Sequence, residues 1–103
     1  MTLSSKRRAE LRAEAHHLDP VVHSGQHGLT PALVRSLDDA LRTRELVKVQ
    51  LGRQDRRPKD AAEMLARAVH ADVVQVIGRT TTLYRENPDL EHAPDAPPPW
   101  RRA

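Results

Sequence analysis

The fold of this chain is decided by residues 21–51, which read VVHSGQHGLTPALVRSLDDALRTRELVKVQL. The apolar start, Val21–Ser24, predicts a short strand, which the glycines that follow would end. Leucines then recur at every fourth position, as on the buried face of a helix; they are Leu29, Leu33, Leu37 and Leu41. We expect Thr30 to cap this helix and Pro31 to hold its first position, where a missing N–H costs nothing.

The same segment ends in a second strand. Residues 46–51 alternate between apolar and polar types, so Val47 and Val49 would share one face and Lys48 would lie on the other. A helix between two strands of one sheet favours parallel pairing through a right-handed crossover. The whole segment therefore predicts a β-α-β unit.

Similar signals extend this pattern in both directions. One helix is expected to end near residue 17, and another to span residues 58–70. Residues 72–77 are apolar on both faces, which predicts a central strand. Residues 80–85 are rich in β-forming types and would pair with that strand in antiparallel fashion.

The resulting order is α-β-α-β-α-β-β. It predicts an α/β fold, α+β-like and two-layered, with a four-stranded mixed sheet. Residues 1–86 would form the domain. Residues 87–103 are rich in proline with isolated apolar residues, and we expect them to be a disordered tail.

The amino-acid composition excludes several classes of function. The formal net charge is +3, which suits polyanionic partners. The chain has no Cys, so disulfides, Cys-ligated zinc and iron–sulfur clusters are excluded. It has no Phe, and Tyr84 and Trp100 are its only Tyr and Trp, so it cannot build an aromatic platform for stacking bases. Nucleic acid would have to be bound through backbone amides, helix ends and basic side chains.

The loop Gly25-Gln26-His27-Gly28 is the most informative segment for function. Two glycines three positions apart let the backbone approach a ligand closely, and the helix that follows offers unpaired amides to an anion. The first turn of that helix has no acid, whereas the helix that starts at Pro58 would have Asp60 and Glu63 in its first turn. The loop therefore predicts a phosphate site with amides unshielded by carboxylates. The plain alternative is a tight strand-to-helix turn.

Six segments follow one another in a characteristic order and spacing: LSSKRRAELR at 3–12, AHHLDPVV at 15–22, GQHGLT at 25–30, RELVKV at 44–49, VQVIGR at 74–79 and LYR at 83–85. Through these segments the chain resembles the CRM domain, the RNA-binding module of the bacterial YhbY family and of plant organelle splicing factors. The resemblance implies a fold similar to the C-terminal domain of translation initiation factor 3. It also implies KH-like RNA binding through the GxxG loop, and an association with precursors of the large ribosomal subunit. The middle loop positions, often basic or Asn in such proteins, are Gln26 and His27 here, so His27 would supply a proton-dependent charge.

The expected RNA-binding set combines the loop, the helix start and nearby cations. Its members are Gly25, Gln26, His27, Gly28, Thr30, Arg35, Lys6, Arg7, Arg8, Lys48 and Arg79. For the basic residues the alternative is an ordinary solvated surface.

Other functions find less support in the residues. His23 and His27 invite a metal site, but glycines exclude the helix that would bring their rings together. No hydrolase elbow, Walker loop or dinucleotide fingerprint is present. The leucine stripe could serve a protein–protein adaptor, or simply form the core. We expect a cytoplasmic, monomeric, non-catalytic RNA-binding protein that needs no cofactor, membrane or small-molecule substrate. A protein adaptor, a translation-associated factor or a small metal-dependent enzyme remain the alternatives.

Overall fold

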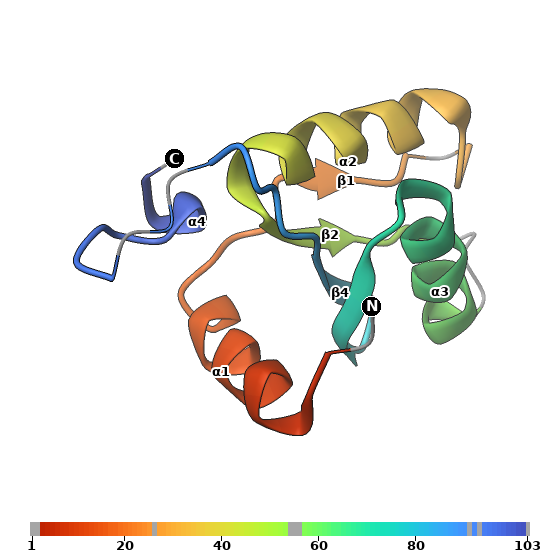
Figure 1. Ribbon diagram of the computed structural model, residues 1–103. Helices are drawn as coiled ribbons and strands as arrows, with labels where there is room; N and C mark the ends of the chain where they lie inside the picture. Colours follow the sequence, from red (N-terminus) through yellow and green to blue (C-terminus); the bar gives the residue numbers. More distant parts are fainter. Residues whose placement is uncertain (1–2, 26, 54–56, 91, 93, 103) are drawn as a thin grey trace.

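A computed structural model describes residues 3–25, 27–53, 57–90, 92 and 94–102 of the chain (Figure 1). Its elements are α1 (Ser5–Ala15), β1 (Val22–His23), α2 (Pro31–Arg44), β2 (Leu46–Gln50), α3 (Pro58–Val69), β3 (Asp72–Ile77), β4 (Thr80–Tyr84) and α4 (Pro99–Arg102). The predicted order is confirmed up to β4, and α4 is an addition near the C-terminal end. Among the described residues, no helix is both long and apolar enough to cross a membrane.

The four strands form one mixed sheet in the order β1-β2-β4-β3. β1 and β2 are parallel, as the helical crossover between them predicts, and Val22 pairs with Val49. β4 lies between β2 and β3 and is antiparallel to both, so Leu83 is paired with Val47 on one side and Val73 on the other. The expected class and the mixed sheet are confirmed.

The expectation that residues 72–77 form a central strand is wrong. β3 is an edge strand, because the hairpin folds β4 back into the position beside β2. The last residue of β3, Ile77, is accordingly 61% exposed. The residues of β3 are apolar on both faces because helices partly cover each face of this edge strand, not because the strand is central in the sheet.

The main core lies between the sheet and two helices, α2 and α3. The leucine stripe of α2 points inward, and Leu37 and Leu41 are fully buried against Val47 and Val49 of β2. Leu65 of α3 packs into the same cluster. Burial of each such side chain stabilises the fold by roughly 2 kcal/mol. The leucine stripe therefore determines which face of α2 packs against the sheet.

A smaller core lies on the opposite face of the sheet. Leu11 of α1 packs there with Leu46, Val74, Tyr84 and Trp100. Figure 1 shows α1 across the sheet from α2. This contact adds a partial third layer to the two layers formed by the sheet with α2 and α3, and it covers mainly the Tyr84 end of β4.

The described part of the segment after residue 86 contacts the domain at two places, whereas its composition predicts a disordered tail. Trp100 in α4 is only 7% exposed and belongs to the smaller core. Nearer the domain, the backbone N–H of Asn87 donates to the buried Glu45 carboxylate at 2.6 Å, and the His92 ring lies 2.7 Å from the same oxygen. One aromatic anchor and a buried carboxylate thus hold a segment that is otherwise poor in apolar residues.

Candidate nucleic-acid interface

The loop between β1 and α2 is a tight turn whose second glycine is structurally required. The N–H of Gly28 donates to the carbonyl of Gly25 at 3.0 Å. Gly28 is buried with φ of +70°, a backbone conformation that side chains rarely adopt. Gly25 differs, because it is exposed and a Cβ there would meet nothing within 4 Å. His27 is exposed between them, and Gln26 lies outside the described residues.

The start of α2 is capped, as predicted, by Thr30. Its Oγ1 accepts from the N–H of Leu33 at 3.2 Å, and its carbonyl accepts from Val34 at 3.1 Å. Pro31 has no N–H to offer. The expectation of bare amides is therefore wrong for Leu33 and for the buried Gly28, because the chain pairs both internally. Within the described part of the chain, Ala32 is the first-turn residue whose N–H has no partner.

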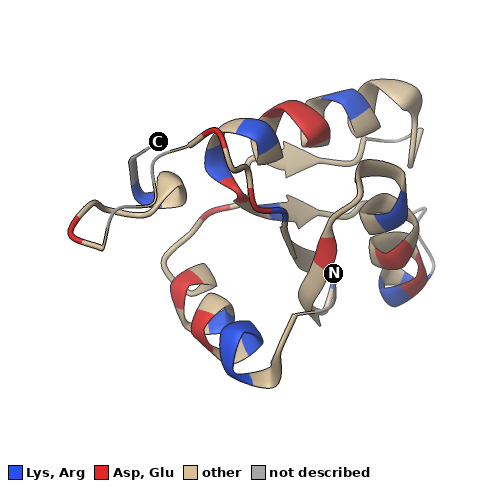
Figure 2. Cartoon of the chain, in the orientation of Figure 1, with Lys and Arg blue, Asp and Glu red and all other residues tan. Residues whose placement is uncertain are grey.

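The electrostatic part of the prediction agrees with the structure. The first turn of α2 contains no acid, whereas that of α3 contains Asp60; Glu63, also expected there, lies beyond the first turn because α3 begins at Pro58. Figure 2 shows the first turn of α2 in tan, followed by a blue basic segment. Arg35 is exposed one turn into the helix. The helix dipole and this cation both favour an anion at the N-terminal end of α2.

A shallow groove runs beside the loop. It has a volume of about 330 Å³ and lies between β1 and the first turns of α2. Its lining includes His23, His27, Thr30 and Ser36, together with the glycines of the loop and small apolar residues. None of the described residues that line it is acidic, so a phosphodiester chain in the groove would meet no opposing charge from them.

Two further turns join the loop at the same end of the sheet. Ser24 Oγ accepts from the N–H of Gly52 at 2.6 Å, which links the loop to the turn after β2. Arg79, in the β3–β4 turn, donates from Nη1 to the carbonyl of Gly52 at 2.7 Å, and its own carbonyl accepts from Leu51. Arg79 is thus brought beside the loop, in a half-buried position. Ser24 and Gly52 were not anticipated, although a Ser next to a strand-ending Gly is a typical turn signal.

Other predicted cations lie away from the loop. The Arg7 guanidinium stacks over the Tyr84 ring at 5.4 Å and donates to Glu10 at 3.2 Å. Tyr84 is at the far end of β4 from the turn that holds Arg79. Lys48 donates from Nζ to the carbonyl of Leu18 at 3.0 Å, which directs its charge toward the segment after α1.

Lys6 and Arg8 belong to the same helix as Arg7. Lys6 is exposed and Arg8 is half-buried. The structure therefore gathers Gly25, His27, Gly28, Thr30, Arg35 and Arg79 around one end of the sheet. It leaves the three cations of α1 and Lys48 on the α1 side of the molecule. In the described residues, no group of three His, Asp or Glu side chains is placed to hold a metal ion.

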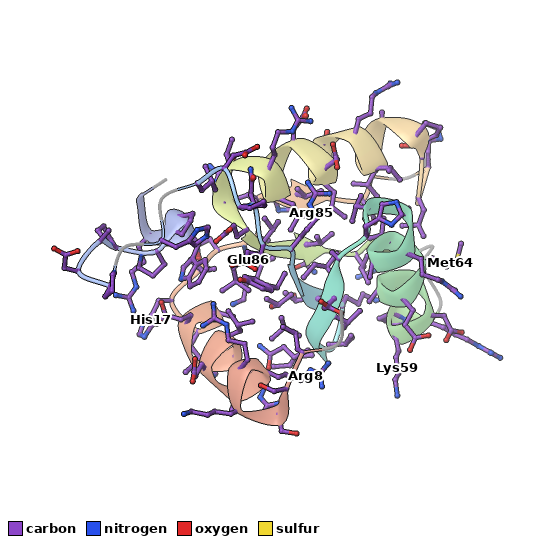
Figure 3. The ribbon with its side chains drawn as sticks, viewed as in Figure 1. Arg8, His17, Lys59, Met64, Arg85 and Glu86 are labelled. Carbon is purple, nitrogen blue, oxygen red and sulfur yellow. The ribbon has the colours of Figure 1, made fainter. Side chains whose placement is uncertain are left out.

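Arg85 holds the two helices of the main core in place (labelled in Figure 3). Its Nη1 donates to Asp38 Oδ1 of α2 and to the carbonyl of Val69 of α3, both at 2.7 Å, and Nη2 donates to the carbonyl of Asp38 at 3.1 Å. The pKa of the Asp38 carboxyl is lowered by the hydrogen bond from Arg85 and then by that from Arg42. The guanidinium of Arg85 is therefore engaged in contacts within the fold. These contacts explain why a basic residue follows Leu83 and Tyr84 at the end of β4.

Comparison with known proteins identifies relatives of this chain by sequence and by fold. The sequence model of the CRS1 / YhbY (CRM) domain matches residues 3–85. The probable RNA-binding protein YqeI of Bacillus subtilis is 36% identical over 86 residues, which cover 82% of this chain and 90% of that protein. An RNA-binding protein of Haemophilus influenzae is 38% identical over 91 residues, with 87% and 92% covered.

A solved structure shows the same fold. The hypothetical protein SAV1595 of Staphylococcus aureus, determined in solution, superimposes with a TM-score of 0.75 at 35% identity. The match covers 87% of this chain and 95% of that one. Sequence, domain extent and fold thus agree, and the chain belongs to the CRS1 / YhbY (CRM) domain family.

Proposed function

We propose that this protein binds RNA without catalysing a reaction, and that its target is ribosomal RNA in precursors of the large subunit. The observation that carries the proposal is the arrangement of residues at the end of the sheet that holds the β1–α2 loop. There a glycine turn and the acid-free start of α2 flank a groove with no carboxylate among its described lining residues, and Arg79 is tied to the loop through Gly52. The names of the relatives from B. subtilis and H. influenzae support RNA as the ligand class.

The mechanism is phosphate docking rather than chemistry. A phosphate of the RNA chain would lie at the groove beside the free N–H of Ala32, with Arg35 and Arg79 supplying longer-range attraction. His27 is exposed at the rim and can add a charge when protonated. Such contacts are made to the backbone, so affinity depends strongly on salt and only weakly on sequence.

The direct test is binding of a fluorescent single-stranded RNA at several salt concentrations. Neutralisation of about five phosphates predicts a slope of about −3.5 for log affinity against log salt. Gly25→Asp puts a carboxylate into open space at the loop and should weaken binding strongly while circular dichroism stays unchanged. The matched control is Ala68→Asp, which adds the same charge at an exposed position near the C-terminal end of α3.

A flat salt dependence, or equal affinity of the Gly25→Asp and Ala68→Asp proteins, would remove the loop from the RNA site. The ribosomal target is tested separately. Crosslinking in cells followed by RNA sequencing and sucrose gradients should recover large-subunit precursors with the protein. Recovery of a nuclease-resistant protein complex alone would instead identify an adaptor.

A further inference from the structure

A row of side chains crosses all four strands at the loop end of the sheet. His23 of β1 pairs with Gln50 of β2, Gln50 with Thr80 of β4, and Thr80 with Ile77 of β3. Residues in register on neighbouring strands point to the same face, so these four side chains lie side by side. We call them the cross-strand row. Their strand neighbours Val22 and Val49 belong to the main core, which places the row on the opposite face, the one that α1 partly covers.

The row is the uncovered part of that face. The smaller core, with Leu11 of α1, sits over Leu46 and Tyr84, which pair with each other at the other end of β2 and β4. Ile77 is 61% exposed and His23 is also exposed, while Gln50 and Thr80 are half-buried. A single exposed Ile is common on protein surfaces. Here it stands in register with three other side chains across the sheet.

The row meets the proposed phosphate site at the β1 edge of the sheet, where His23 belongs to the row and also lines the groove. His23 is followed by Ser24 and Gly25 of the loop, and Ile77 is followed by the turn that holds Arg79. The loop and the turn after Gln50 are joined through the hydrogen bond between Gly52 and Ser24. Four strands at the usual spacing make the row roughly 14 Å wide. An RNA chain held at the groove can therefore reach the row across the edge strand β1.

The chemistry of the row suits unpaired bases. Thr80 Oγ1 donates to Gln50 Oε1 at 3.0 Å, which orients the amide and leaves its NH₂ group with no partner in the described part of the chain. Amide groups hydrogen-bond to base edges, and flat or apolar side chains contact base faces. His23 and Ile77 provide such surfaces at the two ends. The row contains no acid, and Lys48 lies in the next position along β2 on the same face, so the surface is compatible with a polyanion.

We propose that the cross-strand row contacts the bases of a short unpaired RNA segment whose phosphates are held at the loop. The inference rests on the proposed RNA-binding function and assigns its base preference to His23, Gln50 and Ile77. It separates two tasks: the loop and its cations supply affinity that depends on salt, and the row supplies discrimination among bases.

The test measures the full chain with labelled single-stranded oligomers of A, C and U under identical salt. The variants are His23→Ala and Ile77→Ser, alone and combined. We expect the ratio between the best-bound and the worst-bound oligomer to fall by about fivefold or more in the double variant, which corresponds to the loss of one base contact. The slope of log affinity against log salt should not change in the Ile77→Ser protein, because Ile77 is not among the described residues that line the groove and the loop contacts remain.

Met64→Ser is the matched control, because Met64 is also an exposed large apolar residue but lies on α3. Circular dichroism confirms that each variant is folded. A wild-type protein that binds all three oligomers equally, or a double variant that keeps the wild-type ratio, would overturn the role of the row and leave phosphate binding intact. A wild-type protein without salt-dependent RNA binding would overturn the proposed function itself, and the two failures are therefore distinguishable.

Discussion

Trp100 is held on α1 by Glu14. Its Nε1 donates to Glu14 Oε1 at 2.9 Å, and Arg101 donates from Nε to the same oxygen at 2.8 Å. The Trp100 and Tyr84 rings form a T-shaped pair with a centroid distance of 6.4 Å and an interplanar angle of 81°. The C-terminal segment thus completes the smaller core, although it lies outside the region that matches the family.

Trp100→Ala should lower the free energy of unfolding by about 3 kcal/mol, because it empties a buried aromatic site. Trp100→Phe keeps most of the packing and loses the hydrogen bond to Glu14, so its loss should be nearer about 1 kcal/mol. Urea denaturation followed by circular dichroism measures both. Wild-type stability in the Ala variant would show that the segment after residue 86 does not stay docked in solution.

Acid should weaken the fold through two carboxylates. The pKa of Glu14 is lowered, mainly by the hydrogen bond from Arg101, and that of Asp38 mainly by the hydrogen bond from Arg85. A carboxylate whose pKa is lower in the folded state stabilises the fold above its ordinary pKa, and this stabilisation disappears as pH falls through the lowered value. Stability should therefore hold from neutral pH to about pH 5 and decline below about pH 4.

The Glu14→Gln variant tests whether the Glu14 carboxylate contributes to the loss of stability in acid. The variant should be less stable than wild type near neutral pH and should approach it in acid, where Glu14 is protonated in both states. Glu63→Gln, an exposed carboxylate on α3, is the control. A constant difference between Glu14→Gln and wild type across the whole pH range would contradict the assignment.

Replacement of Arg85 should affect stability and not RNA affinity. Its guanidinium bonds Asp38 and the carbonyl of Val69 and is about one quarter exposed, with 23% of the side chain accessible. Arg85→Met should lower the free energy of unfolding by about 2 kcal/mol. Arg85→Lys should recover only part of this loss, because an ammonium group cannot reproduce the planar fork. Loss of RNA binding in a folded Arg85→Met protein would place Arg85 in the interface instead.

The two loop glycines should respond differently to Ala. Gly28→Ala forces a side chain into a backbone with φ of +70° and should cost about 1–2 kcal/mol. Gly25→Ala meets open space and should be close to neutral. Thermal unfolding of the two variants under one set of conditions measures this difference in stability. Equal losses of stability would show that the turn does not hold Gly28 at a positive φ.

His27 should make RNA affinity dependent on pH. If its imidazolium contacts phosphate, affinity should rise as pH falls from about 8 to about 6, and His27→Ala should abolish the rise. His23→Ala is the informative comparison, because His23 also lines the groove but would contact a base. The same pH dependence in wild type and in the His27 variant would exclude the imidazolium contact.

Local sequence determined the elements on either side of the loop. The four-residue spacing of Leu33, Leu37 and Leu41 can bury only one face of a helix, and Thr30 with Pro31 marks where that helix begins. Periodicity and capping act within a few residues of each other, so they can be read without knowledge of the rest of the chain. The alternation in β2 and the glycine turn belong to the same class of signal.

Tertiary structure decided everything that depends on contacts between distant residues. The place of β4 between β2 and β3 follows from which edge the hairpin can join, and this exposes Ile77. The docking of Trp100 on Glu14 joins residues 86 positions apart. Pairing across such separations depends on the shape of the assembled sheet and helices rather than on local propensity. For the same reason, the alignment of Gln50 with Thr80 beside the loop emerged only once the strands were in register.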